Sequence, residues 1–266
     1  MKQSLRFVSG LLLALLPFAL FGTIYGLLGL YPNYRFNPVD VENLYGHELQ
    51  WFGIADGGAR LIPGAYFMHH HWPVADLLSG LFYLCWIPVP MAFAIYLFVC
   101  RRYGWCARFA WAFLVVNLLG FLGYYVHPAA PPWYVLEHGF DVVFDTLGSA
   151  AGLVRFDALT GGSFFHDFYC HNANVFAAIP SLHAAYVLVA ALYSVMSKCP
   201  RWISVAMFVI AAGIWFSAIY TGHHYVIDVL AGIVTALLGV FIFECGIVHS
   251  RRGRTAIKRY ARWMRW

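Results

Sequence analysis

Six long apolar stretches alternate with polar segments along this chain of 266 residues. Each comes close to the ~20 mainly apolar residues that a helix needs to cross a hydrocarbon core. They predict six membrane-spanning helices, near residues 7–30, 75–99, 109–126, 179–196, 202–220 and 225–248. The first resembles a signal peptide, but its apolar run is too long and no cleavage motif of small residues follows it. We therefore expect a retained anchor and an all-α, polytopic bundle of six transmembrane helices.

Two polar segments between these stretches are long enough to hold short helices. Residues 42–55 have an amphipathic pattern in which Leu44, Leu49 and Phe52 are apolar. Residues 141–154 have a similar helical pattern. Loops of this length in a compact protein usually cover or line a site. We expect interfacial helices on the outer face and a single domain over residues 1–266.

The composition agrees with a bilayer environment. Hydrophobic residues make up 62% of the chain and charged residues 11%, whereas soluble domains carry about 25% charged residues. Aromatic residues, at 19%, are typical of proteins that meet lipid headgroups. The same composition excludes disordered, coiled-coil and collagen-like proteins. The six cysteines lack the paired spacing of a zinc site or a disulfide framework.

The charges are divided unevenly between the two predicted sides. Of the 17 basic residues, 14 lie at the N-terminus, in two turns on the same side, or in the tail over residues 249–266. The positive-inside bias therefore predicts that both termini and this basic tail are cytoplasmic. A basic tail after an apolar stretch indicates a membrane flank, so we expect no nucleic-acid partner. Most acidic residues and histidines lie on the opposite side, which predicts an active site on the periplasmic, outer or lumenal face.

The first candidate site lies where the fourth apolar stretch begins, at Pro180-Ser-Leu-His183. Proline is favoured in the first turn of a helix, because the N–H it lacks would be unpaired there. Ser181 and His183 then belong to a helix start, where free N–H groups and the helix dipole favour an anion such as phosphate. A capped helix with an interfacial histidine is the alternative.

The second candidate site lies at the start of the sixth stretch. His224 and Asp228 are four residues apart, so they share one face of a helix. A carboxylate beside an imidazole fixes its tautomer and raises its basicity, which suits a nucleophile. A structural His–Asp pair that closes the bundle is the alternative. Because His183 and His224 begin helices on the same side, we expect them to face each other, in a phosphoryl-transfer site that needs no metal and no cofactor.

These motifs resemble a known family. Residues 123–134 (GYYVHPAAPPWY), 178–184 (AIPSLHA) and 217–225 (SAIYTGHHY), followed by Asp228, are similar to the type 2 phosphatidic acid phosphatase (PAP2) superfamily. Within it, they are closer to the branch of the inositol phosphorylceramide synthases. The motifs lie within residues 120–235, and the chain before them carries no such match.

The resemblance implies a role for each motif residue. His224 would attack phosphorus and form a phosphohistidine, and Asp228 would orient it. His183 would protonate the leaving oxygen and then serve as base for the incoming hydroxyl. Ser181 and nearby N–H groups would hold the equatorial oxygens.

The chain departs from the general superfamily in its basic residues. Ala218 stands where the superfamily has an Arg, and residues 128–133 contain no Lys or Arg. A phosphodiester donor with one negative charge suits such a site better than a phosphomonoester. His127 or His223 would supply partial positive charge instead, and Arg155 would meet a lipid phosphate or pair with Asp157.

The resemblance and the missing arginines together predict a membrane phosphotransferase. We expect it to move a phospho-headgroup, phosphoinositol, from a phospholipid to a lipid alcohol such as ceramide. The partners would be these lipids and the membrane. A lipid phosphatase that hydrolyses phosphatidate-like or prenyl phosphates is one alternative, and a non-catalytic transporter is another.

Overall fold

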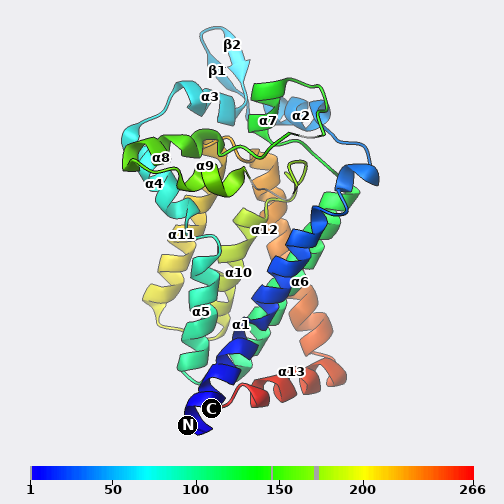
Figure 1. The fold of residues 1–266 in the computed structure, drawn as a ribbon, viewed down its shortest axis with the longest axis vertical. Coiled ribbons are helices and arrows are strands. Elements are labelled where there is room, and N and C mark those ends of the chain that lie inside the picture. Colours follow the sequence, from blue (N-terminus) through cyan, green and yellow to red (C-terminus); the bar gives the residue numbers. More distant parts are fainter. Residues whose placement is uncertain (1, 145, 171–173) are drawn as a thin grey trace.

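The computed structural model describes residues 2–144, 146–170 and 174–266. Long helices run side by side as one bundle, short helices and a β-hairpin gather at one end, and α13 lies across the other end, beside both termini (Figure 1). The long helices are α1 (Lys2–Leu28), α4 (Pro73–Tyr83), α5 (Pro88–Val99), α6 (Tyr103–Val126), α10 (Leu182–Met196), α11 (Arg201–Tyr220) and α12 (Val226–Phe241), which is extended by the π-helix η3 (Ile242–Val248). The shorter elements are η1 (Asn33–Arg35), α2 (Glu42–Phe52), β1 (Ile54–Asp56), β2 (Ala59–Leu61), α3 (Pro63–His69), α7 (Pro132–His138), η2 (Ala151–Leu153), α8 (Val154–Thr160), α9 (Phe164–Tyr169) and α13 (Arg251–Trp263).

The expected helical membrane architecture is confirmed, while the count of six spans stays a prediction. Within the described residues, four helices are long and apolar enough to cross a membrane: α1, α6, α11 and α12 with η3. The pair α4 and α5 adds a fifth span if the two helices cross together. The remaining apolar helix, α10, has 15 residues and is therefore about 22 Å long, shorter than a typical hydrocarbon core.

The second apolar stretch is not the continuous helix that its composition predicts. It breaks between α4 and α5, which meet at 45°. Pro88 begins α5, and because proline has no backbone N–H it cannot extend the hydrogen bonding of α4. The break places Trp86 beside His183, with ring centroids 4.8 Å apart. The kink thus contributes to the candidate site.

The helix predicted over residues 141–154 is wrong for residues 141–144 and 146–150, while residue 145 lies outside the described residues. The part of this segment that the structure describes has no helix before η2 and α8. Tyr134 uses its hydroxyl to bind both the Asp141 carbonyl, at 2.8 Å, and the Val143 N–H, at 2.7 Å. The Asp141 carbonyl, which would accept the first hydrogen bond of such a helix, therefore already has a donor. The other predicted outer helix, residues 42–55, forms as α2 and ends at Phe52.

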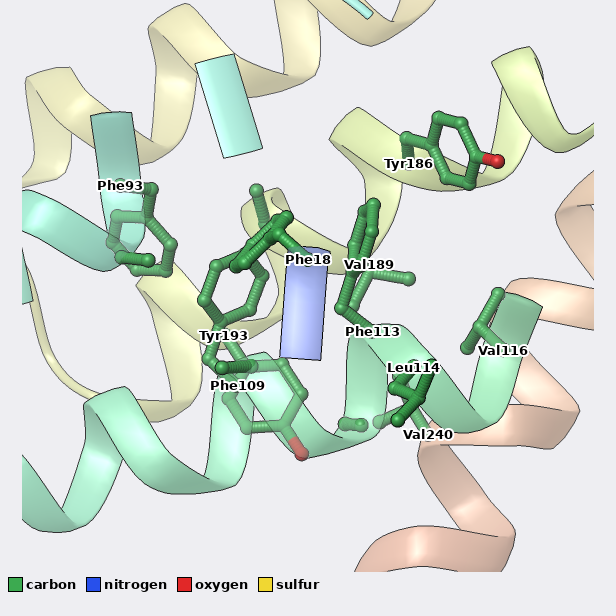
Figure 2. Close-up of a cluster of buried hydrophobic side chains, with 14 of the residues drawn as sticks. Phe18, Phe93, Phe109, Phe113, Leu114, Val116, Tyr186, Val189, Tyr193 and Val240 are labelled. Carbon is green, nitrogen blue, oxygen red and sulfur yellow. The ribbon is translucent and has the colours of Figure 1, made fainter. Parts of the chain in front are cut away.

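An aromatic core fixes α10 at the centre of the bundle (Figure 2). Phe18 of α1 packs on Phe113 of α6, with ring centroids 4.6 Å apart, and Phe113 packs on Tyr186 of α10 at 4.9 Å. Lower on α10, Tyr193 contacts Phe109 at 5.6 Å. Because these large rings are buried, they hold α10 in register with α1 and α6. The register of α10 in turn determines where its first turn, with His183, lies.

Candidate active site

The two helix starts selected from the sequence meet in space. His183, in the first turn of α10, places its Nδ1 atom 3.1 Å from Nε2 of His224, in the turn before α12. The other ring nitrogen of His224, Nδ1, lies 3.4 Å from a carboxylate oxygen of Asp228. Asp228 is completely buried, and its carboxylate also accepts the N–H of Tyr225 at 2.9 Å. This arrangement favours a proton on Nδ1 of His224 and leaves a lone pair on Nε2, as a nucleophile would require.

A direct backbone contact keeps these helix starts together. The Ser181 N–H donates to the Asp228 carbonyl at 2.9 Å, so the residue that precedes α10 is hydrogen-bonded to the first turn of α12. One turn further along α12, Gly232 faces Ser181, and a Cβ atom there would overlap the Ser181 carbonyl oxygen. Only glycine allows this approach. Gly232 therefore sets the separation between the helix starts that carry His183 and His224.

Replacing Gly232 with alanine is expected to lower phosphoryl turnover by about 100-fold, since a displacement of about 1 Å at a reacting centre has that cost. Overpacking would also lower the free energy of unfolding by about 1–3 kcal/mol. Turnover and thermal unfolding of the purified variant measure both effects. Gly246→Ala is the matched control, because nothing lies within 4 Å of the corresponding Cβ position. Unchanged turnover in the Gly232 variant would show that this contact does not position the histidines.

Glu48 caps the helix that carries the His–Asp pair, although it lies far away in the sequence. Its side chain comes from α2 and accepts the N–H groups of Val226, at 2.8 Å, and Ile227, at 3.2 Å. These donors are the first two of α12, which have no partner within the helix. Glu48 is 1% exposed, and burial raises its pKa to about 7. The outer segment thus contributes directly to the position of Asp228.

The raised pKa of Glu48 predicts a pH-dependent stability. The folded protein holds this proton from the ordinary value of 4.5 up to about 7, whereas the unfolded chain has released it. The free energy of unfolding should therefore fall by about 3 kcal/mol as pH rises through this window. Glu48→Gln should remove that fall, as seen in thermal unfolding of wild type and variant at several pH values. The exposed Glu42→Gln on the same helix should keep it. Identical pH profiles for wild type and Glu48→Gln would contradict this account.

Three aromatic side chains surround His183, and sequence reasoning did not identify them. Tyr83 of α4 stacks on its ring at 5.0 Å, and Trp86 contacts it edge to face. The Tyr169 hydroxyl of α9 lies 3.5 Å from Nε2 of His183. These rings hold the imidazole and exclude water from one side of it. With 50 aromatic residues in the chain (17 Tyr, 23 Phe and 10 Trp), no pattern singles these three out.

His223 lies beside the histidine pair and lines the same cavity. Its Nδ1 atom is 3.1 Å from the Thr221 hydroxyl, and Nε2 is buried without a hydrogen-bond partner among the described residues. Burial, together with the neighbouring His224, lowers the pKa of His223 to about 3. It is therefore neutral at physiological pH, so it can offer a hydrogen bond to a substrate but not a full positive charge.

The other three residues selected from the sequence lie outside the cavity lining. Ser181 is buried, and its hydroxyl caps α10 by accepting the Ala184 N–H at 3.4 Å. His127 pairs with Asp40 at 3.2 Å, with half of its side chain exposed. Arg155 binds Asp76 at 2.6 Å, in place of the expected Asp157. Asp157 instead caps α9 through the Phe165 and His166 N–H groups. Their roles toward substrate stay predictions.

A cavity of about 560 Å³ leads from the histidines to α1. At its inner end lie His183, His223 and His224, and at its other end lie Phe21, Gly22 and Tyr25 of α1. Its walls are mainly aromatic and aliphatic, and none of the described residues that line it is Lys or Arg. Gly22 is exposed on the outside of the bundle, with open space beyond its Cα atom. The cavity therefore joins a polar, histidine-bearing end to an apolar end near the lipid-facing surface.

Comparisons with known proteins give one family model and several relatives. A model of the PAP2 superfamily matches residues 61–242. The chain is 51% identical over 256 residues to a phosphoinositol dihydroceramide synthase of Bacteroides thetaiotaomicron, covering 96% of this chain and 84% of that protein. It is 32% identical over 177 residues to an inositol phosphorylceramide synthase of Candida albicans, covering 64% of this chain and 36% of that protein. It is also 32% identical over 169 residues to a catalytic subunit of inositol phosphorylceramide synthase of Saccharomyces cerevisiae, covering 60% of this chain and 41% of that protein. No solved structure matches the chain.

Proposed function

This chain belongs to the PAP2 superfamily, and we propose that it is a membrane enzyme that transfers phosphoinositol from a phospholipid to a ceramide-type lipid alcohol. The observation that carries the proposal is the His183–His224–Asp228 arrangement at the inner end of a mainly apolar cavity. The name of the bacterial relative, 51% identical to this chain, supports the same headgroup and acceptor class. The fungal relatives support the headgroup, although the chain spans only about two fifths of their length.

In the first half of the reaction, Nε2 of His224 attacks the phosphorus of the donor. A P–N bond forms, the P–O bond to diacylglycerol breaks, and His183 gives its proton to the departing oxygen. Without substrate, Nδ1 of His183 is hydrogen-bonded to the attacking nitrogen at 3.1 Å. Donor binding must therefore turn this N–H from His224 toward the leaving oxygen. Asp228 stabilises the positive charge that develops on the His224 ring.

In the second half, the acceptor hydroxyl attacks the phosphohistidine. His183, now neutral, takes the hydroxyl proton as the new P–O bond forms and the P–N bond breaks. The product is a phosphoinositol sphingolipid, and both histidines return to their starting states. Because the phosphohistidine is formed before the acceptor reacts, donor and acceptor react in turn, in a ping-pong sequence.

The cavity suits a substrate with one negative charge. A phosphomonoester dianion needs strong cationic groups, but the described lining residues include no Lys or Arg, and His223 is neutral. Ala218, at the position of the missing Arg, is buried and donates no hydrogen bond from its side chain. Arg155 already neutralises Asp76. A phosphodiester donor therefore fits this site better than phosphatidate does.

The apolar end of the cavity suits the hydrocarbon part of a lipid. Phe21 and Tyr25 line it from α1, and the exposed Gly22 between them leaves room for a chain to enter from the bilayer. We place six spans in the membrane, counting α4 with α5 as one and α10 as another. With the basic end cytoplasmic, the histidines face the periplasm, exterior or lumen.

The deciding experiment supplies the purified protein in lipid vesicles with phosphatidylinositol, labelled at its phosphate, and with dihydroceramide. The label should pass to a sphingolipid product, and this transfer should require dihydroceramide. Labelled inositol phosphate that appears at the same rate with or without dihydroceramide would instead indicate hydrolysis, with water as acceptor. The control is a sphingolipid whose primary hydroxyl is blocked by methylation, which should receive no label.

A further inference from the structure

A strongly basic groove lies at the end of the bundle opposite the histidines. It has a volume of about 920 Å³ and is formed between the α5–α6 turn and α13. The turn contributes Arg101 and Arg102, and α13 contributes Arg254, Lys258 and Arg262, followed by Arg265. Figure 1 shows α13 lying across this end of the bundle, below the long helices. Two segments about 150 residues apart in the sequence therefore direct positive charge into one space.

Almost none of this charge is neutralised within the protein. Among the side chains that the structure describes, Glu244 has the one carboxylate at this end, and it pairs with Arg108 and accepts the Tyr193 hydroxyl. Arg254, Lys258 and Arg262 lie at i, i+4 and i+8 of α13, where like charges repel one another. All three are exposed, and no ion pair within the described residues involves them. An anion in the groove would relieve this repulsion.

The helix that carries these charges is anchored in the fold. Tyr260 and Met264 are buried, and the Tyr260 hydroxyl donates to the Leu13 carbonyl of α1. The Tyr260 ring packs on Trp111 of α6, with centroids 5.5 Å apart. After α13, Trp266 packs on Phe7 at 5.1 Å. The basic side chains are thus held over a built groove and do not belong to a loose tail.

The apolar lining of the groove and its position at the ends of two candidate spans indicate what kind of anion fits. Tyr103, Trp105, Val248 and Ile257 give it an apolar floor. It lies where two candidate spans end, because Tyr103 begins one and Val248 ends another. This is the level at which lipid phosphates meet hydrocarbon chains. A soluble anion would use the charges but not the apolar floor.

We propose that this groove binds the headgroup of an anionic phospholipid from the leaflet opposite the active site. The phosphate lies among Arg254, Lys258, Arg262 and Arg101, and the acyl chains run along the apolar floor between α6 and η3. The bound lipid is a resident ligand of the fold, separate from the donor and acceptor at the histidines. This proposal does not depend on the proposed transferase activity.

The test compares two triple variants of α13 with equal loss of charge. Arg254, Lys258 and Arg262 are changed to Gln in the groove variant, and Arg251, Arg252 and Arg259 in the control. The control residues face a second hollow, of about 860 Å³, which receives basic side chains from α13 alone. Each full-length protein is placed in nanodiscs of phosphatidylcholine with a minor share of phosphatidylglycerol, then extracted in detergent. Native mass spectrometry counts the phosphatidylglycerol molecules that remain bound.

The groove variant should retain phosphatidylglycerol between ten- and about a hundredfold more weakly than wild type, since each basic side chain near an anionic headgroup contributes roughly fivefold. The control variant should retain it as wild type does. Arg101→Gln, on the other wall, should weaken retention about fivefold. An equal loss of phosphatidylglycerol retention in both triple variants would show that retention depends only on the total surface charge, and would overturn the proposal. So would wild-type retention in the groove variant, or full displacement of the lipid by millimolar inorganic phosphate.

Discussion

Replacing His224 with alanine is expected to lower phosphoryl transfer by at least about 10⁴-fold, the usual cost of losing a catalytic nucleophile. Nε2 of His224 is the nitrogen of the His–Asp pair that faces the cavity, because Nδ1 is turned toward Asp228 at 3.4 Å. The neighbouring His223 has the Thr221 hydroxyl, and not a carboxylate, at its Nδ1 atom. His183 lacks a carboxylate at its second nitrogen, which faces the Tyr169 hydroxyl.

The intermediate gives this prediction a second readout. Wild-type protein incubated with phosphate-labelled phosphatidylinositol, without acceptor, should carry a label that acid releases and base does not, as expected of a phosphohistidine. His224→Ala should carry none, and peptide mapping of the wild type should locate the label at His224. His47→Ala, on the exposed face of α2, is the control and should retain full turnover and labelling. A labelled His224→Ala protein would remove His224 from the nucleophile role.

The placement of the four motif residues was largely predictable, because local spacing determines each half of the arrangement. A proline-led helix start placed Ser181 and His183 in one turn, and a separation of four placed Asp228 under His224. The distance between His183 and His224 required one further assumption, that both helices begin on the same side. The resemblance to the PAP2 superfamily, found on these same residues, is confirmed by the family match over residues 61–242.

The supporting residues were not predictable, because their partners are distant in the sequence. Glu48 caps α12 across 178 positions, and nothing near Glu48 indicates that contact. Arg155 has an acidic neighbour two positions away, yet it binds Asp76, which lies 79 positions earlier. Asp157 is unavailable because its oxygens already accept two N–H groups of α9. Local charge patterns cannot reveal such competition.

Two departures from the predicted fold reflect features that apolar composition and periodicity do not register. Apolar composition predicts where the chain enters the membrane, but not where a span bends, so the 45° break between α4 and α5 was missed. Likewise, periodicity predicted a helix over residues 141–154 because it cannot register that Tyr134 binds the Asp141 and Val143 backbone. In the first place a proline interrupts the span, and in the second the Tyr134 hydroxyl, outside the segment, binds its backbone.

Replacing Asp228 with asparagine is expected to lower turnover by about 10³- to 10⁴-fold with little change in KM, as in other enzymes whose histidine loses its carboxylate. The amide can still accept the Tyr225 N–H through its oxygen, so the start of α12 keeps its cap. What it cannot supply is the negative charge that stabilises the phosphorylated His224 ring, nor a firm preference for the Nδ1–H tautomer. Steady-state kinetics and trapping of the labelled intermediate measure the loss.

The same variant separates a catalytic His–Asp pair from a structural one that merely closes the bundle. Asp228 is completely buried, with one carboxylate oxygen unpaired among the described residues, so its charge is costly to the fold. A neutral amide removes that cost, and thermal unfolding of Asp228→Asn should therefore occur at the wild-type temperature or higher. A structural pair predicts the opposite combination, with lowered stability and nearly normal turnover. Loss of turnover in a protein of undiminished stability would assign the buried charge of Asp228 to the reaction. A carboxylate that destabilises the folded protein is then explained by its interaction with the positive charge on His224 in the transition state.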